Sequence, residues 1–261
     1  MWSNLVDKAW LFGGQLASTL PFETVNNVWR FERTVDGDEW TNIVDLGVNT
    51  TIERPFQGAG CSVPDLQKGF YLGGVNSGHD DAHSAQVLHW LYIFDMETET
   101  LKTLPVPEFV PVVNQSLVFV DTGTRSGALV VLGGMIERNS VLSLTPSTSV
   151  FIFDIQSETW LEQETTGQDG GVAEDNSLYI APSTDVPRAR MSACAAVGSA
   201  QDKTSHNILF IGGQNATHAL GDAWILSLPS YVFLSHYPAV IRDMSANQTE
   251  FPQGTLVQSP L

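Results

Sequence analysis

The chain has 261 residues, of which 43% are hydrophobic and only 16% are charged, and its 29 acidic and 12 basic residues give a formal net charge of -17. This length and hydrophobicity favour one large folded domain and argue against intrinsic disorder. The acidic surplus repels phosphate groups and no stretch approaches the ~18 apolar residues of a membrane span, so we expect neither a nucleic-acid partner nor membrane insertion by this chain.

Four apolar runs, each ending at a pair of glycines, recur along the chain. Their first glycines are separated by 60, 60 and 79 residues. Such regular spacing predicts a repeat architecture with a unit of about sixty residues. The glycine pairs are Gly13-Gly14, Gly73-Gly74, Gly133-Gly134 and Gly212-Gly213.

Each glycine pair is followed by an aromatic or β-branched run and then by a further strand-like stretch, and three of the pairs are also preceded by one. Apolar runs of four to eight residues bounded by Gly, Pro, Asn and Ser favour strands over helices. We therefore predict an all-β fold of about four four-stranded antiparallel blades, arranged as a β-propeller or an incomplete propeller arc. The units lie near 9–45, 58–106, 114–165 and 191–235, within repeats spanning 1–235, and 236–261 forms an irregular tail.

The repeat resembles the kelch family, most closely the kelch proteins of filamentous fungi. The glycine pairs, an aromatic residue in the third strand, a large apolar residue in the fourth, and the stretch 187–190 (Pro-Arg-Ala-Arg) carry the resemblance. It implies a propeller of a kind that mostly serves as a binding platform and only sometimes as an enzyme. We expect no cofactor. The third-strand residues are Trp29, Tyr92, Phe151 and Trp224, and the fourth-strand residues are Trp40, Leu101, Trp160 and Phe233.

The chain departs from the fungal pattern at both ends. It begins almost inside the second strand of its first unit, it loses the repeat after His236, and its four units are fewer than the five to seven that are common in the family. We therefore expect a truncated version of a longer protein. Residues 1–8 or the tail could supply a missing strand of the first blade. Family members often have a signal peptide and a transmembrane helix, but residues 1–14 lack a secretory signal, so the compartment stays undetermined.

Candidate binding residues fall in the loops that share one face of the predicted disc. His79, Asp80, Asp81 and His83 form a polar cluster, followed by His89. These side chains could hold a divalent ion if another loop added a ligand. Because the spacing fits no specific metal motif, we predict a polar binding loop and no metal site.

Two further segments offer contacts for a partner. Arg188 and Arg190 could grip an anion, but at the start of a blade such arginines more often tie blades together through carboxylates or carbonyls, and we favour that structural role. The insertion 163–186 is Gly-rich and acidic and then briefly apolar around Tyr179. We expect a mobile loop with an anchoring patch there, or a loop on which a partner docks.

No catalytic signature stands out. The chain has no G-x-S-x-G, H-E-x-x-H or P-loop, and neither Cys61 nor Cys194 matches the tyrosine-linked cysteine of the copper-radical oxidases that form one kelch subfamily. Our first hypothesis is a non-enzymatic scaffold that binds another protein or a glycan through its loop face. The alternatives are an enzyme acting on a sugar or small molecule through paired carboxylates near the axis, and a truncated fragment without function. Four glycosylation sequons, at Asn49, Asn114, Asn215 and Asn247, fit a secretory ancestry.

Overall fold

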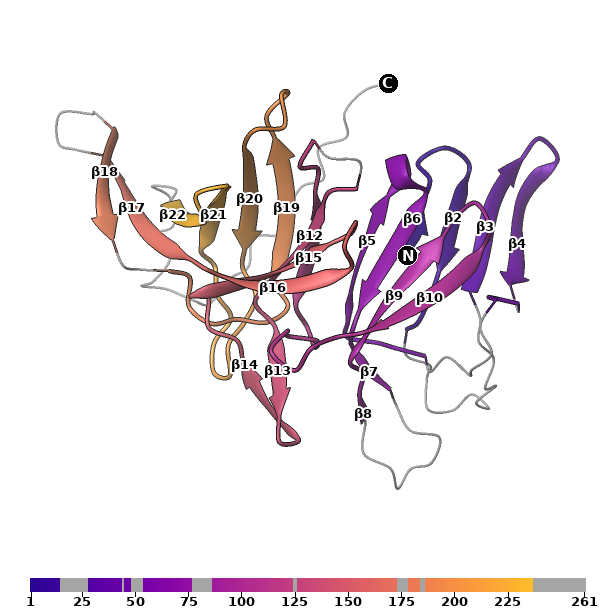
Figure 1. Cartoon of the computed structure of the whole chain (residues 1–261), viewed down its shortest axis with the longest axis horizontal. Coiled ribbons are helices and arrows are strands. Elements are labelled where there is room, and N and C mark those ends of the chain that lie inside the picture. Colours follow the sequence, from indigo (N-terminus) through magenta and orange to yellow (C-terminus); the bar gives the residue numbers. More distant parts are fainter. Residues whose placement is uncertain are drawn as a thin grey trace, which may run out of the picture.

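The structure, a computed structural model, describes residues 1–14, 28–43, 45–47, 54–76, 86–123, 126–172, 178–183 and 186–236, without the side chains of 168–172, 178–183 and 236. Four main sheets follow one another along the chain, and two two-stranded hairpins accompany them (Figure 1). The described ranges hold one helical element, the 3-10 helix η1 (Pro64–Leu66), and no helix long and apolar enough to cross a membrane. The predicted all-β class is confirmed.

The first two sheets are four-stranded blades. In blade one the strand order is β1-β2-β3-β4, and the pairing of Trp2 with Trp10 shows that residues at the start of the chain supply its first strand. Blade one consists of β1 (Trp2–Ser3), β2 (Lys8–Leu11), β3 (Val28–Thr34) and β4 (Gly37–Ile43). Blade two consists of β5 (Ala59–Val63), β6 (Lys68–Leu72), β9 (Trp90–Asp95) and β10 (Thr100–Pro105), and a short hairpin of β7 (Val75–Asn76) and β8 (Gln86–Val87) extends from it.

The other two blades repeat this order. Blade three consists of β11 (Ser116–Val120), β12 (Ala128–Leu132), β15 (Ser149–Asp154) and β16 (Thr159–Glu164), with a hairpin of β13 (Met135–Arg138) and β14 (Val141–Leu144) between β12 and β15. Blade four consists of β19 (Cys194–Ser199), β20 (His206–Ile211), β21 (Ala223–Leu228) and β22 (Val232–His236). Four four-stranded antiparallel units are therefore present, as the glycine repeat predicts.

The insertion at 163–186 differs from the loop that we predicted. It forms β17 (Thr166–Val172) and β18 (Leu178–Ser183), which pair antiparallel with each other, while β17 runs parallel to β22 and widens blade four. An outer strand such as β22 exposes a row of unpaired backbone groups, and β17 covers them. The segment 163–186 is rich in glycine and acidic residues, which are rare in strands, so its sequence did not indicate this pairing.

The blades pack face to face through three apolar clusters. One cluster joins blades one and two around Trp2, Trp10 and Phe94, and equivalent clusters join blades two and three and blades three and four. On the inner side of the arc, β1 contacts β5, β5 contacts β11, and β11 contacts β19. Figure 1 shows blade one and blade four at opposite ends of the molecule, so the described blades form an arc, consistent with an incomplete kelch-type propeller.

The glycine pairs explain how one blade is fixed to the next. At Gly73 a side chain would place its Cβ 2.2 Å from the carbonyl oxygen of Val112, and φ is +63°, so both the close approach and the left-handed backbone require glycine. In three pairs the N–H of the second glycine donates to a carbonyl that lies four residues before the first strand of the next blade. These bonds are Gly14 to Pro55 (2.8 Å), Gly74 to Val112 (2.6 Å) and Gly134 to Arg190 (2.8 Å).

Blade four breaks this pattern. Within the described residues the N–H of Gly213, the equivalent donor, bonds to no carbonyl. The ideal Cβ position of Gly212 meets only Leu220 of its own blade, at 3.4 Å. Among the described residues, the face of blade four that points away from blade three therefore has no neighbouring blade, unlike the corresponding faces of the other three blades.

Candidate functional site

The loop end of the molecule carries the connections between the second and third strands of each blade. Hairpins β7–β8 and β13–β14 both extend from the lower end of the molecule in Figure 1. The β13–β14 hairpin forms because Asn139 and Ser140 both adopt positive φ in a two-residue turn, the geometry that matches the twist of paired strands. Backbone bonds between Val113 and Met135 fix its base to the segment that leads into blade three.

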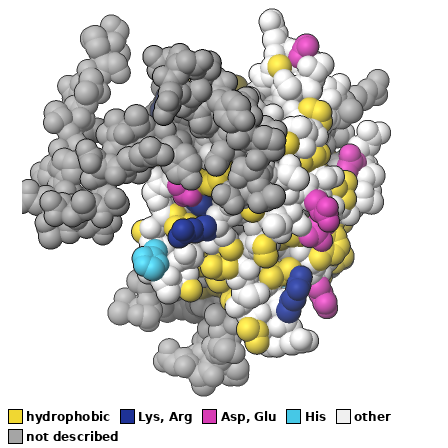
Figure 2. All heavy atoms as spheres, turned by 90° about the vertical axis from the view of Figure 1, so that its left-hand side faces the viewer, with side chains coloured by type: hydrophobic (Ala, Val, Ile, Leu, Met, Phe, Trp, Pro, Cys, Tyr) yellow, Lys and Arg dark blue, Asp and Glu magenta, His cyan; other side chains and the backbone are white. Residues whose placement is uncertain are grey.

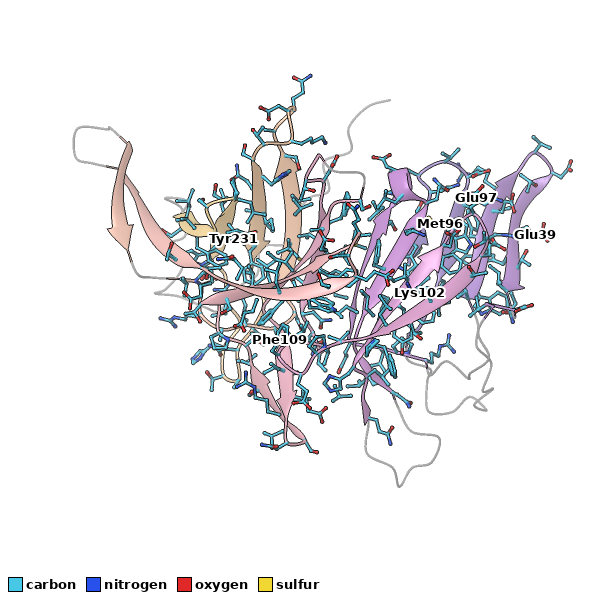
Figure 3. The ribbon with its side chains drawn as sticks, in the orientation of Figure 1. Glu39, Met96, Glu97, Lys102, Phe109 and Tyr231 are labelled. Carbon is cyan, nitrogen blue, oxygen red and sulfur yellow. The ribbon has the colours of Figure 1, made fainter. Side chains whose placement is uncertain are left out.

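A cavity of about 310 Å³ lies between this hairpin and the body of blade three. Its apolar wall includes Phe109 and Phe151, whose ring centroids are 6.2 Å apart at an interplanar angle of 33°. Figure 3 labels Phe109 beside the base of the hairpin. The lining residues are Phe109, Ile136, Arg138, Ser143, Leu144, Thr145, Pro146, Thr148, Ser149, Phe151 and Glu162.

Polar groups converge on the same cavity. Thr145 is only 4% exposed, and its hydroxyl has no hydrogen-bond partner among the described residues. A buried hydroxyl without a partner costs about 1–3 kcal/mol. Arg138 and Glu162, both exposed, add one positive and one negative charge to the lining. The site can hold a ligand by apolar contact, by hydroxyl hydrogen bonds and by one group of each charge.

One side-chain contact braces the hairpin from blade two. His89 Nε2 lies 2.8 Å from Glu137 Oε2, and this pair joins the segment after β8 to strand β13. His89 Nδ1 is buried and has no hydrogen-bond partner among the described residues. This contact therefore ties blade two to the hairpin that forms one wall of the cavity.

The structure describes only some of the residues that we singled out from the sequence. His79, Asp80, Asp81 and His83 lie outside the described residues, and so does the side chain of Tyr179, whose backbone belongs to β18. Elsewhere in the described part, no group of three or more His, Cys, Asp or Glu side chains is arranged to hold a metal ion. The predicted polar binding loop therefore stays a prediction.

The two arginines have different environments. Arg188 is exposed, and its carbonyl accepts a hydrogen bond from Arg190 Nε at 3.0 Å. The side chain of Arg190 is fully buried, donates to both carboxylate oxygens of Asp222 and to the carbonyl of Gly212, and lies 5.4 Å from the ring centroid of Phe210. The Arg190 guanidinium therefore cannot contact a ligand and organises blade four, while its own carbonyl holds Gly134 of blade three.

The sequence analysis did not single out Phe109 or Thr145. The one available signal was the pattern around Asn139-Ser140, where two short alternating segments flank a two-residue turn. That pattern predicts a hairpin but does not reveal what the hairpin encloses, because Phe109 comes from a separate inter-blade segment.

No family model matches the chain. The chain is similar to a kelch repeat-containing protein of the fungus Arthroderma benhamiae, with 23% identity over 271 aligned residues that cover 88% of this chain. It spans 38% of the length of that relative. The glycine-pair repeat, the four-stranded antiparallel blades and this similarity over most of the chain support a kelch-repeat protein.

Proposed function

We propose that this kelch-repeat protein is a non-enzymatic scaffold that binds a protein partner through its loop face, at the cavity between Phe109 and the β13–β14 hairpin. Kelch-repeat proteins generally act as protein-binding scaffolds. The observation that carries the assignment to this place is the cavity of about 310 Å³ at the loop end, whose lining combines the Phe109 and Phe151 rings with hydroxyl-bearing residues. Binding surfaces are typically apolar pockets with a few convergent polar groups on loops of a rigid scaffold.

The hairpin itself offers a surface for a peptide. Val141 is 63% exposed and Leu142 is also exposed, although both are apolar. In the described residues β14 pairs with β13 alone, so the other edge of β14 presents free backbone donors and acceptors. An extended segment of a partner could pair with this edge and place an apolar side chain in the cavity.

The test measures how tightly peptides bind to variants of the chain, and it includes the same substitution at a valine of the proposed site and at a valine elsewhere. Peptides are selected from a displayed random library on the immobilised wild-type chain, and their affinities are then measured for the variants. We expect Val141→Glu and Phe109→Ala to weaken binding about tenfold or more, since each removes or charges a central apolar contact. Val35→Glu, at a fully exposed turn between β3 and β4, should bind like the wild type. Equal affinity of all three variants would refute the assignment.

A glycan is the second candidate ligand. Ser143, Thr148 and Ser149 line the cavity together with Phe109 and Phe151, and hydroxyls next to aromatic rings suit a polyhydroxylated ligand. Immobilised glycans that bind the wild type but not Phe109→Ala, together with no selected peptide, would favour the glycan over the protein partner.

A further inference from the structure

We propose that the packing between blades three and four holds a second binding site, for a small neutral aromatic molecule with one hydroxyl group, that is, a phenol. A cavity of about 230 Å³ lies between these two blades, and we call it the joint cavity. The proposal is independent of the ligand site on the loop face. The lining of the joint cavity includes Val130, Ile152, Lys203, Thr204, Leu228 and Tyr231.

The joint cavity lies at the end of the blades opposite to the β13–β14 hairpin. Lys203 and Thr204 belong to the turn between β19 and β20, and Tyr231 belongs to the turn between β21 and β22. In an antiparallel blade, these turns lie at the end away from the connection between the second and third strands. Figure 3 labels Tyr231 above Phe109, on the side away from the hairpin. The joint cavity is therefore separate from the cavity at Phe109.

The cavity exists because side chains at this place are smaller than in the preceding pair of blades. Counted back from the glycine pairs, Val130 of blade three corresponds to Phe70 of blade two, which is fully buried between blades two and three. Leu226 of blade four corresponds in the same way to Phe153 of blade three, since each pairs with the residue four positions before the first glycine. Two phenyl rings are thus replaced by aliphatic side chains, which leaves space for the ring of a ligand.

The buried part of the joint cavity is apolar. Val130, Ile152 and Leu228 are all less than 9% exposed and belong to the apolar cluster between blades three and four, against which Tyr231 also packs. An apolar cavity of about 150 Å³ stays dry and binds benzene. The joint cavity is larger, at about 230 Å³, so it can hold a single aromatic ring with a short substituent.

Two polar side chains of the lining can hold one hydroxyl group. Lys203 Nζ lies 3.2 Å from Asp121 Oδ2, and a lysine ammonium has three N–H groups, so it can donate to a further acceptor. The Thr204 hydroxyl donates to Asp202 Oδ1 at 2.8 Å, and its oxygen can still accept a hydrogen bond. A phenol hydroxyl both donates and accepts. It can therefore accept from Lys203 and donate to Thr204.

The charges around the joint cavity favour a neutral ligand. Lys203 is the one Lys, Arg, Asp or Glu among the described lining residues, and Asp121 balances its charge. The lining also contains His206, whose Nδ1 lies 2.8 Å from Ser199 Oγ. An anion would compete with Asp121 and would be repelled by the chain's net charge of -17, and a cation would meet Lys203. Among the described side chains on the blade-four end of the molecule, Figure 2 shows only a few basic ones.

The test titrates the full chain with three probes of similar size and measures their affinities by ligand-observed NMR. The probes are p-cresol, toluene, which lacks the hydroxyl, and benzoate, which is charged. We expect p-cresol to bind and toluene to bind about five- to tenfold more weakly, since it loses one hydrogen bond. Benzoate should bind more weakly than p-cresol. No binding of p-cresol, or a tighter binding of benzoate, would overturn the proposal.

Two variants locate the binding. Val130→Phe brings into the joint cavity the ring that Phe70 provides between blades two and three, so p-cresol should no longer bind. Val35→Phe, the same change at a fully exposed turn, should bind p-cresol like the wild type. Circular dichroism spectra that match the wild type show that these variants fold. Unchanged binding of p-cresol to a folded Val130→Phe would refute the location.

Thr204→Val tests the hydroxyl contact without altering the apolar cluster, because Thr204 is exposed. Valine keeps the shape of the side chain but cannot accept a hydrogen bond. We expect this variant to bind toluene like the wild type and p-cresol several-fold more weakly, so that the preference for p-cresol shrinks. A preference as large as that of the wild type would contradict the proposed recognition of the hydroxyl.

Discussion

Replacing Gly73 by alanine tests whether the glycine pairs hold neighbouring blades together. The alanine Cβ would lie 2.2 Å from the carbonyl oxygen and 2.6 Å from the Cβ of Val112, in the segment that leads into blade three. Because these contacts are with backbone and with a branched side chain at its root, they cannot be relieved by rotating a flexible side chain. Gly212 is the matched control, since its φ of +66° is nearly the same as the +63° of Gly73 but its nearest neighbour is at an ordinary 3.4 Å.

The two substitutions should lower the free energy of unfolding by different amounts, because only the alanine at position 73 clashes with Val112 of the segment that leads into blade three. Both place alanine in the left-handed region, which costs about 1–2 kcal/mol. Only Gly73→Ala also forces the blades apart, at about 1–3 kcal/mol for an overpacked contact. It also strains the 2.6 Å bond from Gly74 to Val112, which is worth about 1 kcal/mol. We therefore expect a loss of about 3–6 kcal/mol for Gly73→Ala and about 1–2 kcal/mol for Gly212→Ala.

Urea unfolding followed by tryptophan fluorescence measures this difference. The midpoint should fall much further for Gly73→Ala than for Gly212→Ala. Gly133→Ala, whose Cβ would lie 2.7 Å from the carbonyl oxygen of Arg190, should resemble Gly73→Ala. Equal midpoints for Gly73→Ala and Gly212→Ala would refute the reasoning, because they would show that the left-handed backbone alone demands glycine.

Two further predictions concern titratable side chains. Burial raises the pKa of the Cys61 thiol to about 12. A thiol reagent at pH 8 should therefore modify only the exposed Cys194 in the native chain, and both cysteines after unfolding. Rapid modification of Cys61 in the native chain would contradict this. Burial opposes ionisation of Asp222, but hydrogen bonds from Arg190 and Trp224 outweigh it and lower the pKa of Asp222. The stability gained from the ionised Asp222 is therefore present at neutral pH and lost as pH falls below about 4, so the difference in urea midpoint between wild type and Asp222→Asn should shrink at low pH.

The four blades could be predicted from the sequence because certain positions of each repeat need a particular type of residue for local reasons. Gly73 and Gly133 need left-handed backbone, and Tyr92 and Phe151 need apolar surroundings, so each leaves a residue type at a fixed spacing. The partner of Arg190 could not be predicted in this way. Asp222 lies 32 residues further along the chain, and the pairing of β19 with β20 and of β20 with β21 brings the two side chains together.

The candidate site was predicted only in outline. The sequence analysis placed the candidate binding residues in loops that share one face of the predicted disc, and the cavity is lined by residues of such connections. Which residues enclose it depends on the fold of the β13–β14 hairpin over Phe151 and on the approach of Phe109 from another segment. Such contacts between connections have no periodicity, so no pattern in the sequence indicates them.

A repeat position specifies a side chain but not its environment, because the environment depends on the neighbouring blade. Ile211 and Leu72 occupy the same place relative to their glycine pairs, yet Leu72 is buried and Ile211 is exposed. In repeat proteins the stability of a unit depends on its own folding and on its interface with each neighbour. Blade four has one such interface in this structure, whereas blades two and three have two each. Ile211 and Trp40 are exposed because no described blade covers them, whereas Leu72, Leu132 and Leu101 at the same positions of the inner blades are buried by a neighbour.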